Sequence, residues 1–140
     1  MTHKRKAIRD AVVTILTNAS IVAAGQVYSN RRFRIDENSL PALNVYSATE
    51  TSAPANNTQP TYLRTLTLII IAVAENKASE AIDDTMDALS EAIENALKAD
   101  LQLAGTAIDS SLSATDFIED ETGQITAGQI ALTYQVKYIA

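Results

Sequence analysis

One stretch, Leu66 to Ala74, constrains the fold of this chain more than any other. It is apolar or β-branched at nearly every position, which predicts a strand buried on both faces at the centre of a sheet, with Ile70 and Val73 in the core. Extended from Tyr62 to Glu75, this strand would span about 45 Å at ~3.3 Å per residue, whereas common strands have only about five or six residues. We therefore expect one end of the strand to project beyond the domain.

Two other segments have the periodicity of amphipathic helices. One extends from about Lys4 to Asn18, and the other follows the long strand and continues to about Lys98. Apolar residues of the second helix recur at steps of three and four, while its acids fall largely elsewhere around the axis. One stripe of each helix should therefore pack on the sheet, and the remainder should face water.

Shorter alternating segments predict the remaining strands. Three of them are Val27–Tyr28, Ala42–Thr49 and Ile130–Tyr138. The fourth alternates weakly from Ile108 to about Asp120, and we expect Ile108, Leu112 and Ile118 to anchor it in the core. Between two of them, the polar, proline-containing sequence predicts a long mobile loop at about residues 51–61. Together, the elements predict a single α+β domain over residues 1–140, with a mostly antiparallel or mixed β-sheet packed by two helices.

The net charge of −6 conceals an uneven distribution. Residues 1–36 hold seven Lys or Arg and two Asp, a balance of +5, so the remainder carries −11. An acidic protein of this kind is a poor general binder of nucleic acid. The absence of cysteine excludes disulfides and thiolate chemistry and fits a reducing compartment such as the cytoplasm. Because no apolar run can cross a bilayer and the basic N-terminus lacks the core of a signal peptide, we expect no membrane association.

Two groups of residues are candidates for contacts with partners. The basic residues of the first 34 positions can bind an acidic protein surface, phosphate or nucleic acid, although a solvated helix turn and an arginine-guarded edge strand are the simpler explanations. The polar loop offers an arm to neighbouring copies of the chain. The candidate contacts are Lys4, Arg5, Lys6, Arg31, Arg32 and Arg34 in the first group, and Thr51, Ser52, Asn56 and Asn57 in the second.

No residue pattern points to catalysis. The chain lacks a glycine-rich phosphate loop and a nucleophile elbow, and its single histidine, His3, is close to the chain end. The acidic clusters 83–87 and 116–121 could hold a hard cation, but solvated surface explains them better. We therefore expect no catalytic residue, no metal and no cofactor, and a small metal-dependent or ligand-binding enzyme built on these acids is a further alternative.

Several strings, in their order along the chain, resemble a known family. The first half contains a short basic helix, the aromatic segment 27–31, and the string Asp36-Glu37-Asn38-Ser39-Leu40-Pro41 before an alternating strand. In the second half, a long strand enters an acidic helix at Ala78-Ser79-Glu80, and an acidic turn precedes the closing strand. This layout resembles the tail terminator proteins of long-tailed phages, the lambda minor tail protein U type.

The resemblance implies a structural protein of the virion and not an enzyme. Such proteins form a six-membered ring on the head-proximal end of the tail tube, where the ring stops tube polymerisation and presents the surface that joins the head. The implied partners are further copies in a hexameric ring, the tail tube protein and a head-completion or neck protein, and DNA passes through the ring without specific binding. The implied location is the neck region of the virion tail, after assembly in the host cytoplasm. The alternatives are another neck, tail-completion or head–tail connector protein, or a nucleic-acid-binding module.

Overall fold

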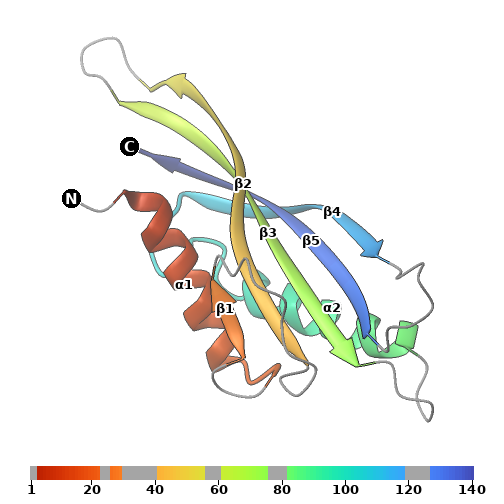
Figure 1. The fold of residues 1–140 in the computed structure, drawn as a ribbon. Helices are drawn as coiled ribbons and strands as arrows, with labels where there is room; N and C mark the ends of the chain where they lie inside the picture. Colours follow the sequence, from red (N-terminus) through yellow and green to blue (C-terminus); the bar gives the residue numbers. More distant parts are fainter. Residues whose placement is uncertain (1–2, 23–25, 30–40, 56–60, 76–81, 119–126) are drawn as a thin grey trace.

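The computed structural model describes residues 3–22, 26–29, 41–55, 61–75, 82–118 and 127–140. This part of the chain forms two helices and five strands (Figure 1). Their order is α1 (Lys4–Asn18), β1 (Val27–Ser29), β2 (Ala42–Pro54), β3 (Tyr62–Glu75), α2 (Ile82–Lys98), β4 (Asp109–Ile118) and β5 (Ala127–Ile139). The predicted α+β class is confirmed, and α1 and β3 have the bounds that the sequence predicts.

The five strands form one mixed sheet in the order β1-β2-β3-β5-β4. β1 is parallel to β2, and all other neighbours are antiparallel. β3 is the central strand and pairs along almost its whole length with β2 on one side and β5 on the other. The apolar run therefore occupies the centre of the sheet, as predicted.

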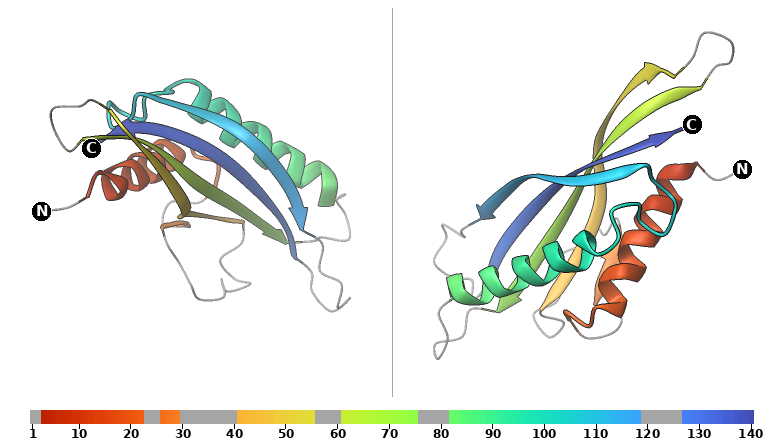
Figure 2. Two further views of the ribbon diagram at one scale, coloured as in Figure 1. Left: turned by 90° about the horizontal axis from the view of Figure 1, so that it is seen from above. Right: turned by 180° about the vertical axis from the view of Figure 1, so that it is seen from behind.

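Both helices cover the same face of the sheet (Figure 2, right). α1 lies against β1 and β2, α2 lies against β3 and β5, and the two helices contact each other. Burying each large apolar side chain between these layers contributes about 1.5–3 kcal/mol, so this layer of contacts is the main source of stability. Its buried members include Ile8, Val12 and Leu16 of α1, Met86, Ile93 and Leu97 of α2, and Leu66, Leu68 and Ile70 of β3.

The two faces of β3 differ in burial, which corrects one expectation. Leu66, Leu68 and Ile70 are buried beneath the helices, whereas Ile71 and Val73 on the opposite face are only half-buried. The prediction of equal burial on both faces, with Val73 in the core, is therefore wrong, and Ile70 is confirmed as a core residue. The physical reason is the layering, because both described helices pack on one side of the sheet.

β2 is longer than the sequence predicts, which shortens the predicted loop. Residues 51–54 are strand and not loop, with Thr51 opposite Thr65 and Pro54 opposite Tyr62. The amide of Ala55 donates to the carbonyl of Thr61 at 2.9 Å and continues the pairing. Backbone pairing along β3 holds these residues in an extended conformation, although Ala53 and Pro54 have low strand propensity. Residues 56–60 of the predicted loop lie outside the described residues.

Candidate assembly site: the arm and its base

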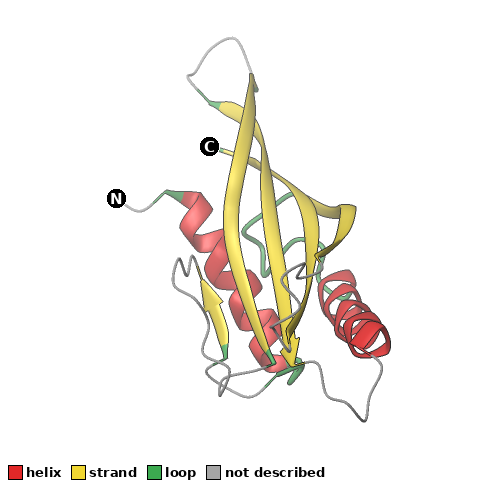
Figure 3. Cartoon of the chain, turned by 45° about the vertical axis from the view of Figure 1, so that its right-hand side comes forward, coloured by secondary structure: helices red, strands yellow, loops and turns green. Residues whose placement is uncertain are grey.

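A paired strand end projects beyond both helices (Figures 1 and 3). We use the name arm for residues 51–54 of β2 and 62–65 of β3, which pair with each other. Residues 51–55 are all exposed, and Leu63 is 40% exposed although it is apolar. The end of β5 supports the arm, because Leu63 lies opposite Ile139, and Tyr62 and Ala140 exchange two backbone hydrogen bonds of 2.9 and 3.0 Å.

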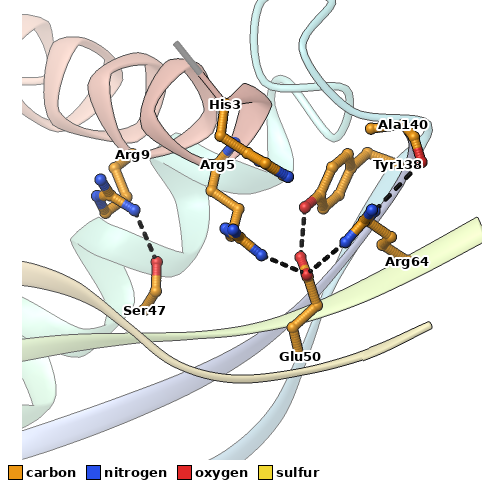
Figure 4. Close-up of polar contacts among 8 residues, drawn as sticks. All are labelled: His3, Arg5, Arg9, Ser47, Glu50, Arg64, Tyr138 and Ala140. Carbon is orange, nitrogen blue, oxygen red and sulfur yellow. Dashed lines mark hydrogen bonds and ion pairs between the residues drawn. The ribbon is translucent and has the colours of Figure 1, made fainter. Parts of the chain in front are cut away.

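The base of the arm is built around one carboxylate, Glu50 (Figure 4). Its Oε2 accepts hydrogen bonds from Arg5 Nη1 at 2.6 Å and from Arg64 Nη1 at 3.2 Å, while its Oε1 accepts a hydrogen bond from the Tyr138 hydroxyl. Arg64 also donates from Nε to the carbonyl of Ala140 at 3.2 Å. The Glu50 side chain is only 11% exposed. These contacts join α1, β2, β3 and β5 where the arm leaves the domain, so we call Glu50, Arg5, Arg64 and Tyr138 the clamp.

A β-bulge places Glu50 on the face that carries the helices. Ser47 lies opposite Leu68, but Thr49 lies opposite Thr67, so Ala48 is an extra residue in β2. An extra residue reverses the alternation of side chains along a strand. Glu50 therefore pairs with buried Leu66 and faces α1, where Arg5 can reach it.

The electrostatics of the clamp favour an ionised Glu50. Burial alone would raise the pKa of Glu50, but the hydrogen bonds from Tyr138 and Arg64 and the charge of Arg5 outweigh it, and the pKa is lowered. Burial and the hydrogen bond to Glu50 raise the pKa of Tyr138 to about 12. Partial burial and the charges of Arg5 and Arg64 lower the pKa of His3. The two guanidinium groups and the neutral phenol therefore stabilise the charged form of the Glu50 carboxylate.

The three described basic residues that were predicted as partner contacts, Lys4, Arg5 and Lys6, have partners within the chain. Arg5 belongs to the clamp, and Lys4 Nζ donates to the carbonyl of Ile139 at 2.9 Å. Lys6 pairs with Asp10 at 2.6 Å in a solvent-exposed i, i+4 contact. Lys4 and Arg5 thus tie the start of α1 to the base of the arm, and the intramolecular contacts of all three side chains reduce their availability to a nucleic acid.

The other candidate contacts fall into two classes. Thr51 and Ser52 are exposed strand residues of the arm and not loop residues. The remaining candidates, Arg31, Arg32, Arg34, Asn56 and Asn57, lie outside the described residues.

Two further expectations concern the segment that contains β4, where Ile108 and Leu112 are exposed and do not anchor the segment in the core. Their exposure follows from position, because β4 is an edge strand and α2 lies over β3 and β5.

Sequence reasoning missed most of the clamp. The partners of Glu50 are 14, 45 and 88 residues away along the chain, so no local motif connects them. The structural role of His3 is also not evident from the sequence. Its Nδ1 accepts a hydrogen bond from the Arg5 amide at 3.1 Å and so caps α1, and its ring makes an edge-to-face contact with Tyr138. A histidine before a helical stripe could have indicated a cap, although Ser, Thr, Asp and Asn are the usual signals.

The described residues contain no constellation for metal-dependent chemistry. Within ranges 3–22, 26–29, 41–55, 61–75, 82–118 and 127–140, no three metal-ligating side chains gather to hold an ion. In the same ranges, no helix is both long and apolar enough to cross a membrane.

Comparisons with known proteins found a matching family and a similar solved structure. The model of a family described as phage minor tail protein U matches residues 3–138. A solved structure described as the virion of a native gene transfer agent particle contains a chain similar to this one, with a TM-score of 0.57 and 17% sequence identity over 96% of this chain and 98% of that chain. At this identity, the likeness shows a shared fold alone. No curated protein matches the chain.

Proposed function

The chain belongs to the phage minor tail protein U family, and from this premise we propose that it is a tail terminator. In this proposal, copies assemble as a hexameric ring on the head-proximal end of the tail tube. The ring stops polymerisation of the tube and forms the surface that joins the head. Its partners are neighbouring copies, the tail tube protein and a head-completion or neck protein, and its location is the neck of the virion.

The projecting arm is the observation that carries the proposal. An isolated domain gains nothing from extending two paired strands into water, because their exposed residues bury little apolar surface. An arm that reaches a neighbour explains both its length and the clamp, since a rigid arm loses less conformational entropy on binding than a flexible one. A contact between an arm and a different surface of the next copy is heterologous, which is the kind of contact that closes into rings.

The nucleic-acid-binding alternative lacks a comparable observation. The described basic side chains at the start of α1 are engaged with Glu50, Asp10 and the carbonyl of Ile139. In the proposed ring, DNA slides through the channel without specific contacts, and the overall acidic charge suits such passage. A role as a different neck or tail-completion protein is the closest alternative, because it uses the same ring symmetry.

Imaging and tail length together test the proposal. We expect the purified protein to form rings in negative-stain electron micrographs, alone or bound to one end of purified tail tubes. We also expect phage that lack the protein to produce overlong tubes and phage that regain it to produce tubes of uniform length. Tubes of normal length in its absence, with unattached heads, would instead support a different neck component.

An arm-shortened variant connects this function to the structure. Ser52 and Arg64 are antiparallel partners, so Asn-Gly in place of residues 53–63 can close a two-residue hairpin and leave the clamp intact. We expect this variant to fold and to fail in ring assembly. The control replaces only residues 56–60 by Asn-Gly and retains the paired arm. Normal rings from the arm-shortened variant would contradict the role of the arm.

A further inference from the structure

The exposed large apolar side chains of the described residues fall into two groups. The first is on the arm and the strand end beside it, and consists of Tyr62, Leu63 and Ile139. The second is on β4 and the turn before it, and consists of Leu101, Ile108, Leu112 and Phe117. Phe117 is 64% exposed, although it lies opposite the fully buried Ile130 of β5. Apolar side chains gathered in this way mark surfaces that are covered in an assembly.

Two strand edges are open in the same places. β4 ends the strand order and pairs only with β5, so its outer edge has no strand neighbour among the described residues. β1 pairs only with residues 43–45 of β2, so within the described chain the outer edge of β2 is open from Tyr46 to Pro54. An open edge is a template for pairing with another strand. β4 contains no proline, lysine or arginine, and the features that discourage pairing along it are a bulge near Ser113 and the aspartates Asp109 and Asp116.

The charges of the two edges are opposite. At the base of the arm, Lys4, Arg5 and Arg64 gather near Glu50, and Lys137 lies opposite Asp109 of β4. All three salt bridges among the described residues lie on this side of the molecule. On the other side, the exposed acids of α2 and β4 have no ion-pair partner within the described chain. These acids are Asp84, Asp87 and Glu91 of α2 and Asp116 of β4, whereas Asp109 lies at the start of β4 beside Lys137.

We propose that the arm of one copy docks along β4 of a second copy, with the open edge of β2 pairing to the open edge of β4 and the basic arm base facing the acidic side of α2. This inference rests on the proposed ring and names the two surfaces that meet in it. Repeated from copy to copy, the contact joins the five-stranded sheets into one continuous sheet.

A second copy fits these surfaces better than an unrelated partner. The open edges of β2 and β4 lie on opposite sides of one chain, so the β2 edge of one copy can pair with the β4 edge of the next. The exposed acids of α2 can then face the basic residues at the arm base of the next copy. Residues 49–54 also match the length of an ordinary strand, about five or six residues, and can be accommodated along the ten residues of β4.

Cysteine cross-linking tests the contact directly, because the chain has no cysteine of its own. In a continuous sheet, side chains on the face opposite the helices line up across the new edge. Thr51, Ser111 and Ala114 lie on this face, whereas Thr115 lies on the face of the helices. We expect T51C combined with S111C or A114C to form disulfide-linked ladders under mild oxidation, since linked Cβ atoms must approach to about 3.5–4.5 Å.

Two controls make the cross-linking decisive. T51C combined with T115C places the thiols on opposite faces and should give at least tenfold less ladder. T51C alone cannot form a ladder and should remain monomeric on non-reducing gels. Efficient dimers of T51C alone would show that arms meet each other, which would overturn the proposal. Equal ladders from matched and mismatched pairs would overturn it as well.

Charge reversal provides an independent measurement. K4E with K6E reverses two basic side chains at the start of α1 beside the arm base, and D84K with D87K reverses two acids on α2. We expect each double variant alone to associate at least tenfold more weakly than the wild type and an equal mixture of the two to regain association, because each then meets an opposite charge. If wild-type rings form on tails but neither cross-links nor mixing effects appear, the proposed function stands and this interface is wrong. If no ring or higher oligomer forms under any of these conditions, both are wrong.

Discussion

Replacing Glu50 by alanine tests the clamp most directly, because it removes three hydrogen bonds at once. The bonds from Arg64 and Tyr138 are well shielded, and each is worth about 1.5 kcal/mol. The Arg5 side chain is 37% exposed, so solvent screening reduces its contribution to about 0.5 kcal/mol. The expected loss of unfolding free energy is thus about 3.5 kcal/mol, within a total of about 5–15 kcal/mol for a domain of this kind.

Thermal and chemical denaturation measure this loss. At about 3 °C per kcal/mol, E50A should lower Tm by about 10 °C while the protein still unfolds cooperatively. E50Q should fall between E50A and the wild type, because its amide oxygen can still accept a hydrogen bond but carries no charge. Proteolysis of the arm should accelerate in E50A, since the base no longer holds it.

The surface pair Lys6–Asp10 provides a matched control. Its separation of 2.6 Å equals that of Arg5 and Glu50, but both of its side chains are more than half exposed. D10A should therefore cost only about 0.3–0.5 kcal/mol, the usual value for an exposed i, i+4 pair. If E50A and D10A shift Tm equally, the clamp does not stabilise the fold and the reasoning about the arm base is refuted.

Four further predictions concern pH dependence, core packing and DNA binding. The pKa of Glu50 is lowered in the folded protein, so the charged carboxylate contributes fully to stability above its ordinary pKa of 4.5, and this contribution is lost as pH falls. In urea titrations, the difference in unfolding free energy between wild type and E50Q should therefore shrink from about pH 6 to about pH 3. The pKa of Tyr138 is raised to about 12, so wild type should lose more stability than Y138F between about pH 10 and 12, and equal losses would contradict this assignment. I70A should lower the unfolding free energy by about 2–5 kcal/mol and I71A by less than half as much, because only Ile70 is fully buried; similar losses would mean that the opposite face is equally packed. Duplex DNA should bind with a Kd weaker than about 10 μM at physiological salt in a fluorescence anisotropy titration, and sub-micromolar binding that K4S/R5S/K6S abolishes would contradict the assembly role of these residues.

Local patterns predicted the elements well. Apolar residues at helical steps defined α1 at Lys4–Asn18, and the apolar run with its flanks defined β3 at Tyr62–Glu75. Periodicity is a property of neighbouring residues, and the burial of one stripe or one face expresses it directly. The order of elements and the string preceding Pro41 were also sufficient to suggest the family that the match over residues 3–138 shows.

Predictions that depended on distant partners failed where the partner decided the outcome. Residues 51–54 have the composition of a loop, yet they form a strand because β3 provides a template beside them. Ile108 and Leu112 have the composition of a buried strand, yet they are exposed because β4 is at the edge and α2 lies over other strands. In both cases, the neighbour across the sheet outweighed local propensity.

The sequence alone determined the α+β class, the central strand and the absence of recognisable catalytic motifs, because these depend on composition and on spacings of two to four residues. Only the tertiary structure revealed the clamp. Its partners are separated by up to 88 residues, and one extra residue at Ala48 decides which face of the sheet Glu50 occupies. Without that bulge, strict alternation would place the carboxylate on the face opposite α1, away from Arg5. Such a one-residue shift leaves no mark in the local pattern, because it is set by the pairing of β2 with β3.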